Sequence, residues 1–142
     1  MAIKRKATAK WEGTLKEGAG HLKLGSGAFE GPYSFKSRFE DGTGTNPEEL
    51  IGAAEAGCFA MAMSLGLEEA GFKPESIDAD ADVSLVQVDG GFKIESIHLM
   101  VEASIPDISE DKFQEVAEAT KKNCPVSVAL SATDIILDAK LK

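Results

Sequence analysis

Two cysteines are the residues of this sequence whose types and spacing suggest chemistry. Cys58 lies in an apolar run from Leu50 to Leu67, and Cys124 begins a Cys-Pro-Val-Ser segment 66 positions later. A thiolate can attack a substrate and a second thiol can then close a disulfide, so the pair suggests a nucleophile and its resolving partner. Because free cysteine is also among the most buried residue types, two inert core thiols are an equally good interpretation of the spacing alone.

The apolar run around Cys58 approaches the length of a membrane span. It carries Glu55 and three glycines and follows Pro47-Glu-Glu49, so we interpret it as a buried helix. The basic N-terminal residues Met1 to Lys6 are not followed by the apolar stretch of a signal peptide. We therefore expect a cytoplasmic protein that does not bind membranes. In that reducing compartment a disulfide between the two cysteines would be transient and catalytic.

Composition limits the size of the protein and the class of its partners. A chain of 142 residues that is 43% apolar and 27% charged fits one globular domain, residues 1–142. The formal net charge of −9 repels phosphates, and no stripe of Lys and Arg interleaved with aromatic residues occurs. We expect no nucleic-acid partner, and small neutral or apolar ligands fit better.

The helix that would carry Cys58 has clear start and stop signals. Asn46 suits the N-cap, Pro47 suits the first helical position, and Glu49 completes a capping-box pattern. Gly71, followed by Phe-Lys-Pro, ends it after about 24 residues, or roughly 36 Å. A helix that is apolar nearly all round must be covered on more than one side, and a chain of this size has few elements to do so. We therefore predict a homodimer.

The remaining pattern predicts an α+β fold of antiparallel sheets around this long buried central helix. Alternation of Tyr33 to Glu40 indicates a strand, with Tyr33, Phe35 and Phe39 on one face and Arg38 on the other. Cys124 is the expected N-cap of a short helix that starts at Pro125, where backbone N–H groups would favour its thiolate. The other expected elements are a hairpin of Ile3 to Leu15 and His21 to Leu24, a hairpin of Ser76 to Val88 and Phe92 to Ile105 around Asp89-Gly-Gly91, a helix from Ser109 to Lys122 with Phe113, Val116 and Ala117 toward the core, and a last strand from Asp134 to Leu141.

Several segments together resemble a known family. They are the Thr-Asn-Pro-Glu-Glu-Leu-Ile-Gly-Ala-Ala segment of residues 45–54, the Ala-Gly-Cys-Phe that follows, Arg38 upstream and Cys-Pro-Val-Ser downstream. The chain closely resembles the OsmC branch of the OsmC/Ohr family of thiol peroxidases through essentially its whole length, including Trp11-Glu-Gly and the Gly-Phe-Lys-Pro after the long helix. The resemblance implies reduction of organic hydroperoxides in an intertwined α+β homodimer.

The resemblance also implies a role for each site residue. The peroxidatic cysteine falls on Cys58, the resolving cysteine on Cys124, the family arginine on Arg38 and the family glutamate on Glu48; Glu49 is the weaker match. It further implies recycling by an external dithiol, of lipoyl type or another small dithiol.

Thiol chemistry gives the arginine and the glutamate a physical reason. A thiol with a pKa of about 8.5 is mostly protonated at neutral pH, and an apolar site raises that pKa further, so Cys58 needs a cation nearby. Arg38 can supply the charge, and Glu48 can hold its guanidinium in place. The alternatives are a solvated strand arginine and a first-turn acid that complements the helix dipole. If the helix is continuous, Glu48 and Cys58 lie about 15 Å apart along its axis, so we expect one subunit to complete the site of the other.

The expected reaction begins with attack of the Cys58 thiolate on a peroxide, which gives a sulfenic acid that Cys124 condenses into a disulfide. Phe59, Met61 and Phe39 are expected to surround the nucleophile and to favour bulky organic peroxides over H2O2.

Other chemistries fit the sequence less well. His21 and His98 could join the cysteines as zinc ligands, but no close-paired spacing supports this, so we predict no metal and no cofactor. A Cys-His hydrolase would leave the arginine, the glutamate and the second cysteine unexplained. The main alternative is a non-enzymatic dimeric carrier of small apolar molecules with structural thiols.

Overall fold

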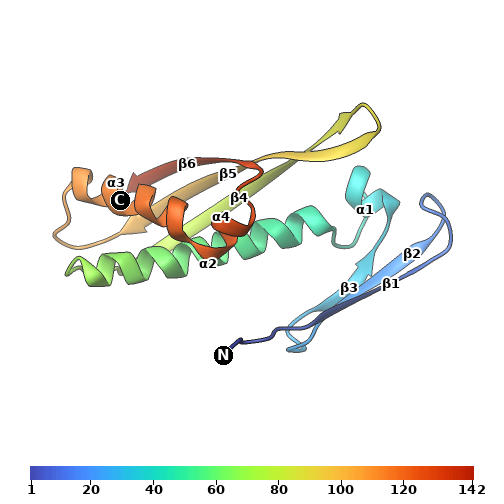
Figure 1. Cartoon of the computed structure of the whole chain (residues 1–142), viewed down its shortest axis with the longest axis horizontal. Coiled ribbons are helices and arrows are strands. Elements are labelled where there is room, and N and C mark those ends of the chain that lie inside the picture. The colour runs from blue at the N-terminus through green and yellow to red at the C-terminus, as the bar shows by residue number, and fades with distance from the viewer. The chain divides into compact units, whose positions relative to one another are not determined.

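The computed structural model describes all residues, 1–142, and has a mixed α+β order (Figure 1). The elements are β1 (Ala7–Glu12), β2 (Ala19–Leu24), β3 (Glu30–Tyr33), α1 (Phe35–Phe39), α2 (Pro47–Glu69), β4 (Ser76–Val88), β5 (Gly91–Ser104), α3 (Glu110–Asn123), α4 (Pro125–Ala129) and β6 (Asp134–Leu141). The chain divides into two compact units, Met1–Leu50 and Ile51–Lys142, which are described separately.

The first unit is built on an antiparallel sheet in the order β1-β2-β3. The predicted hairpin is present, with a first strand shorter than Ile3 to Leu15. Trp11 and Tyr33 pack with ring centroids 5.4 Å apart across the sheet. A Cβ atom at Gly20 would lie 2.3 Å from the Tyr33 ring and 2.7 Å from the Trp11 ring, so this ring pair requires glycine on the strand between them.

The predicted strand from Tyr33 to Glu40 is wrong, because β3 ends at Tyr33 and the short helix α1 follows. Ser34 and Ser37 form a reciprocal capping box: each side-chain oxygen accepts the other residue's backbone N–H, at 3.1 and 2.9 Å. Phe35 and Phe39 lie on one face of α1. A spacing of four residues is close to one helical turn and is also a multiple of the two-residue repeat of a strand, so the same pattern fits both structures. Arg38 is not on an opposite face: its Cζ lies 5.2 Å from the Phe39 ring centroid.

The long helix α2 begins and ends where the sequence predicts. Asn46 Oδ1 accepts the Glu49 N–H at 2.8 Å, and the Glu49 carboxylate accepts the Thr45 hydroxyl at 2.7 Å. At the other end Gly71 has φ +93°, and the Phe72 N–H donates to Leu67 O at 2.9 Å. The result is one continuous helix of 23 residues.

The second unit is built on a sheet in the order β4-β5-β6. The predicted hairpin of β4 and β5 is confirmed, and positive φ values at Gly90 and Gly91 form its turn. The last strand is the exception to the expected antiparallel pairing, because β6 runs parallel to β5 after the crossover through α3 and α4. The helix after Ser109 is confirmed, with the Ser109 hydroxyl accepting the Lys112 N–H at 3.2 Å.

The core of the second unit lies between α2, the sheet and α3. Phe59, Met63 and Leu67 lie on successive turns of α2 and are fully buried. They belong to one cluster with buried residues of β5, α3 and β6, namely Ile97, Leu99, Val101, Ala103, Phe113, Val116, Ala117 and Ile135. This confirms the core face predicted for the helix after Ser109.

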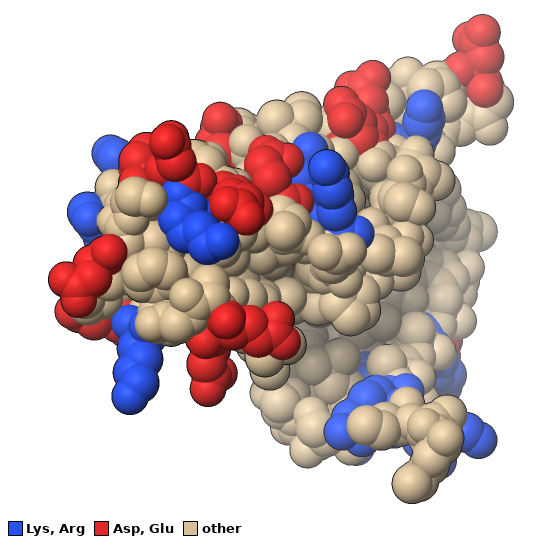
Figure 2. Space-filling view, turned by 60° about the vertical axis from the view of Figure 1, so that its left-hand side comes forward, with Lys and Arg blue, Asp and Glu red and all other residues tan.

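The remaining face of α2 is uncovered in the single chain. Met61 is 78% exposed and Leu65 is 55% exposed, so the expectation of a helix buried on all sides is not met within one chain. By length and composition alone this helix could cross a membrane, which is weak evidence because core helices of water-soluble proteins meet the same test. On the face of the molecule drawn in Figure 2, acidic side chains predominate in the upper part, with Lys and Arg among them, and no continuous basic band crosses the view.

Candidate functional site

The two cysteines lie in contact in the second unit. Cys124 Sγ is the donor in a hydrogen bond to Cys58 Sγ at 2.9 Å, and both thiols are free. A disulfide bond is much shorter, at about 2.05 Å, so these are two reduced thiols already adjacent. Cys124 is fully buried and Cys58 is partly exposed. An incoming molecule therefore reaches Cys58 more easily than Cys124.

The junction of two helices holds Cys124 against α2. Its N–H donates to Thr120 O at 2.8 Å and closes α3, and Pro125 starts α4 directly afterwards. A residue before proline is disfavoured in the helical conformation, and Cys124 has φ −55° and ψ 125°. The sequence therefore breaks the helix at the cysteine and fixes the direction of its side chain.

Burial raises the pKa of the Cys58 thiol above its ordinary value, and the neighbouring Cys124 thiol and the Glu55 charge raise it further. A hydrogen bond from the Val126 backbone N–H opposes them and lowers the pKa. The expectation that the start of α4 would act on Cys124 is not met, because Cys124 makes no side-chain cap bond there. The N–H group at the start of α4 acts on Cys58 instead.

Arg38 and Glu48 form an ion pair in the first unit. Arg38 Nη2 donates to Glu48 Oε1 at 2.7 Å, and Nε donates to both carboxylate oxygens at 3.0 and 3.3 Å. The Glu48 side chain is only 9% exposed, against 36% for Arg38. A buried carboxylate thus fixes a half-exposed guanidinium whose Nη1 is not used by Glu48. Arg38 is not the solvated strand arginine of the alternative interpretation.

An aromatic pocket of about 240 Å³ includes Arg38. Its walls come entirely from the first unit and are Trp11, Leu15, Tyr33, Ser34, Phe35, Arg38 and Phe39. The pocket therefore combines one cation with apolar and aromatic surface. Phe59, in contrast, is fully buried in the core of the second unit and offers no surface to a ligand in this chain, contrary to expectation.

Glu55 and Ser127 were not predicted as site residues. Glu55 lies three residues before Cys58 and is fully buried, and the Ser127 hydroxyl donates to its Oε1. Glu55 Oε2 is buried without a hydrogen-bond partner. The available signal was a single acid inside the apolar run of α2, at a spacing that places it on the same side of the helix as Cys58.

The two histidines pair with carboxylates. His21 Nε2 lies 3.1 Å from Glu30 Oε2, and His98 Nε2 lies 2.5 Å from Asp138 Oδ2. Each pair joins neighbouring strands of a sheet, which gives both histidines a structural role on exposed strand faces.

Comparison with known proteins finds relatives that cover the whole chain. The family model described as OsmC-like protein matches residues 40–138. Peroxiredoxin OsmC of Escherichia coli is 51% identical over 143 aligned residues, covering 100% of this chain and 99% of that protein. Organic hydroperoxide resistance protein OhrB of Bacillus subtilis is 33% identical over 126 residues, covering 86% of this chain and 90% of that protein.

Solved structures support the fold. The crystal structure of Bacillus subtilis OhrB has a TM-score of 0.69 at 27% identity and covers 96% of this chain and 98% of its own. An OsmC protein from Legionella pneumophila has a TM-score of 0.74 at 23% identity, with 99% of both chains covered. On the sequence match and this shared α+β fold, the chain belongs to the OsmC-like protein family.

Proposed function

We propose that this protein is a cysteine peroxidase that reduces organic hydroperoxides to alcohols. The observation that carries the proposal is the contact between a partly exposed and a buried thiol, Cys58 and Cys124, at 2.9 Å. It is supported by similarity over the whole chain to a protein named Peroxiredoxin OsmC and by relatives named for organic hydroperoxide resistance. A carrier with inert thiols gives no reason for bringing the two sulfurs together.

The proposed reaction has three steps. The Cys58 thiolate attacks the terminal oxygen of ROOH, the O–O bond breaks, and the alkoxide takes up a proton and leaves as ROH. The Cys124 thiol then attacks the sulfur of the resulting sulfenic acid, forming the disulfide and releasing the hydroxyl with the thiol proton as water. An external dithiol reduces the disulfide and is itself oxidised to a disulfide.

Arg38 is proposed to supply the cation that Cys58 lacks among its neighbours in the second unit. The raised pKa of Cys58 keeps it mainly a thiol, and a guanidinium nearby would favour the thiolate and stabilise the developing alkoxide. Glu48 serves as a positioning residue, because it fixes two nitrogens of the guanidinium and leaves Nη1 for the reacting atoms.

We further propose that the active form is a homodimer in which Arg38 of one subunit serves Cys58 of the other. Glu48 and Cys58 lie on one continuous helix, about 15 Å apart along its axis, which is too far for one guanidinium to bond both in a single chain. The exposed Met61 and Leu65 on the same helix supply apolar surface for a second subunit. Mixed dimers of Glu48→Ala and Cys58→Ser chains test the idea: they should retain activity through the one intact composite site. If these mixed dimers are inactive, and activity requires Glu48 and Cys58 to be intact on the same chain, the idea is wrong.

The substrate is proposed to be a hydroperoxide with a bulky organic group. The pocket beside Arg38 is lined by Trp11, Tyr33, Phe35 and Phe39 and suits an apolar group next to a cation. Cumene hydroperoxide should therefore have a higher kcat/KM than H2O2. A preference for H2O2 would contradict this assignment.

The reductant is proposed to be a small external dithiol, of lipoyl type or similar, in a reducing cytoplasm. A groove of about 610 Å³ along α2 and α3 has Pro125 and the buried Cys124 in its wall, so a small dithiol bound there would lie close to the Cys58–Cys124 disulfide.

Turnover of cumene hydroperoxide with excess dithiol tests the function. In excess dithiol the wild type should consume peroxide and Cys58→Ser should not. In a separate reaction without dithiol, Cys124→Ser should react once and then stop at the Cys58 sulfenic acid. An inactive wild type with several dithiols, together with slow labelling of both thiols, would instead support the carrier.

A further inference from the structure

Glu55 is a buried acid that the proposed reaction does not use. Its side chain is fully buried, its Oε1 accepts the Ser127 hydroxyl, and its Oε2 has no hydrogen-bond partner within the chain. Burying a carboxyl group with one oxygen unsatisfied costs free energy, and a residue of α2 that only filled the core could be apolar. Core packing alone therefore does not explain why residue 55 is a glutamate.

The partner of Glu55 lies on the segment that carries the resolving thiol. Ser127 is the third residue of α4, and Cys124 is the N-cap of that helix. Glu55 lies one turn before Cys58 on α2. The hydrogen bond between Glu55 and Ser127 thus joins α2 to α4 beside the contact between their two sulfurs.

The short helix α4 is also held by the Val126 N–H on Cys58 and by its C-cap residue Leu130, which packs against the core, but it has a single buried side chain of its own. It spans only five residues, its Val128 is 54% exposed, and Ser127 is the only one of its residues that is fully enclosed, at 2% exposure. A five-residue helix is not stable by itself, so tertiary contacts must fix it. A charge-assisted hydrogen bond from its one buried side chain is well suited to that task.

We propose that Glu55 and Ser127 form a clamp that positions Cys124 for the resolving step. Glu55 is a positioning residue here: it holds α4 through Ser127, and α4 holds the Cys124 sulfur against the Cys58 sulfur. The clamp acts on the step in which the Cys124 thiol attacks the Cys58 sulfenic acid and water leaves, and it is not required for the first attack on the peroxide.

The clamp has a consequence for the competition between resolution and overoxidation. A sulfenic acid that is not resolved reacts with a second peroxide to give a sulfinic acid, which is not reduced by dithiols. Loosening α4 should therefore slow disulfide formation and increase the sulfinic acid formed per turnover. Loss of one hydrogen bond to a charged group corresponds to a change on the order of tenfold.

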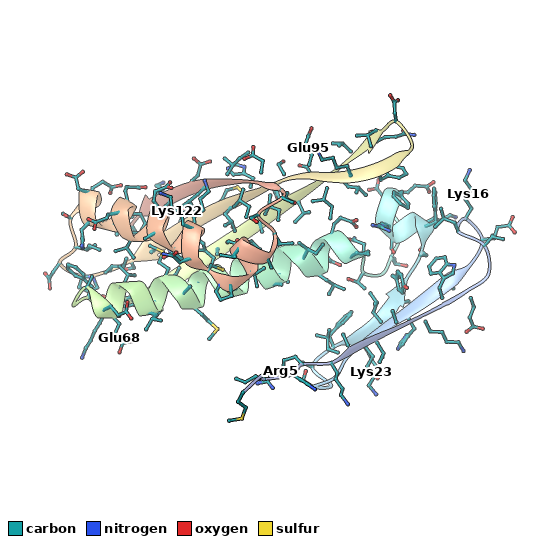
Figure 3. The ribbon with its side chains drawn as sticks, viewed as in Figure 1. Arg5, Lys16, Lys23, Glu68, Glu95 and Lys122 are labelled. Atoms are coloured by element: carbon teal, nitrogen blue, oxygen red, sulfur yellow. The ribbon has the colours of Figure 1, made fainter.

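The variants Ser127→Ala and Glu55→Ala test the clamp, with Ser127→Thr as the variant that keeps a hydroxyl. Rapid mixing with cumene hydroperoxide should show disulfide formation slowed about tenfold and more Cys58 sulfinic acid by mass spectrometry in both variants. The first step should be near wild type in Ser127→Ala and no slower than wild type in Glu55→Ala, because that change removes a charge that raises the pKa of Cys58. Ser127→Thr should restore most of the rate of disulfide formation. Glu68→Ala and Ser131→Ala are matched controls, because both side chains are exposed and Glu68 projects from α2 away from the sheet (Figure 3).

Two readouts separate a clamp from general destabilisation. Circular dichroism must show the variants folded at the assay temperature, and the rate of the first step reports an intact Cys58. If folded Ser127→Ala and Glu55→Ala form the disulfide and the sulfinic acid at wild-type rates, the clamp is wrong. The inference rests on the proposed peroxidase function, and failure of that function would appear separately as a wild type that does not react with peroxide at all.

Discussion

At the residue scale the reactivity of this protein depends on charge around one sulfur. Burial, Cys124 and Glu55 all raise the pKa of Cys58, and only the Val126 N–H acts against them within the second unit. The thiolate fraction therefore increases only at a pH above that of an ordinary cysteine unless a cation is supplied. That cation is the function we assign to Arg38.

Replacing Arg38 should therefore move the pH dependence of Cys58. In Arg38→Met the midpoint of the alkylation rate against pH should shift upward from the wild-type value, because the thiolate loses its stabilising charge. Arg38→Lys, which keeps the charge but not the planar fork, should shift it less. Iodoacetamide labelling of the Cys124→Ser background measures Cys58 alone, and equal midpoints in all three proteins would rule out a role for Arg38 in activation.

Glu48→Gln should act in the same direction through the guanidinium. Glutamine removes the charge and one of the two acceptor oxygens, which weakens the hold on Arg38, so kcat/KM for cumene hydroperoxide should fall by about tenfold or more while the fold is kept. Glu49→Gln is the matched control one position along the helix, because the Glu49 carboxylate binds Thr45 and not Arg38. A larger loss in Glu49→Gln would reverse the assignment of the two acids.

At the element scale the start of α2 links two helices through one residue. Asn46 Oδ1 accepts the Glu49 N–H at 2.8 Å, and Asn46 Nδ2 donates to Ser37 O, in α1, at 3.1 Å. Asn46→Ala should lower the free energy of unfolding by about 1 to 2 kcal/mol, and Asn46→Asp, which keeps the cap, should lower it less. Urea unfolding measures both, with the exposed Asn123→Ala as control.

The same element shows what sequence patterns can and cannot determine. Helix α2 was predictable to within a residue or two because Asn46, Pro47 and Gly71 act locally on the backbone. The segment after Tyr33 was misassigned because a four-residue spacing of aromatic residues fits both periods, and the Ser34 and Ser37 capping box was the signal against a strand. The parallel pairing of β6 depends on a long crossover that no local pattern encodes.

In the candidate site, too, some features could be predicted from the sequence and others depend on the packing of the folded chain. Cys58, Cys124, Arg38 and Glu48 could be named from motif residues, and the structure joins them as two contacts, one between the sulfurs and one ion pair. The pairing of Glu55 with Ser127 spans 72 positions and exists only through the packing of α4 on α2. Burial of a carboxylate is likewise a property of the folded chain and not of its neighbours in sequence.

At the scale of the whole molecule the open face of α2 predicts association. A fully buried face carries Phe59, Met63 and Leu67, and the other face exposes Met61 and Leu65. Met61→Glu with Leu65→Glu should convert the proposed dimer to a monomer at micromolar concentration, because it places charges in an apolar interface. Light scattering measures the mass, Glu68→Lys serves as the exposed control, and a wild type that is a stable monomer would refute the dimer.

The central claim, that Cys58 attacks the peroxide and Cys124 resolves the product, is tested most directly by mass spectrometry after one turnover without reductant. The wild type treated with one equivalent of cumene hydroperoxide should contain a Cys58 to Cys124 disulfide. Cys124→Ser should contain a sulfenic acid on Cys58 that dimedone traps, and Cys58→Ser should keep a free thiol at Cys124. Two unmodified thiols in the wild type after excess peroxide would contradict the account.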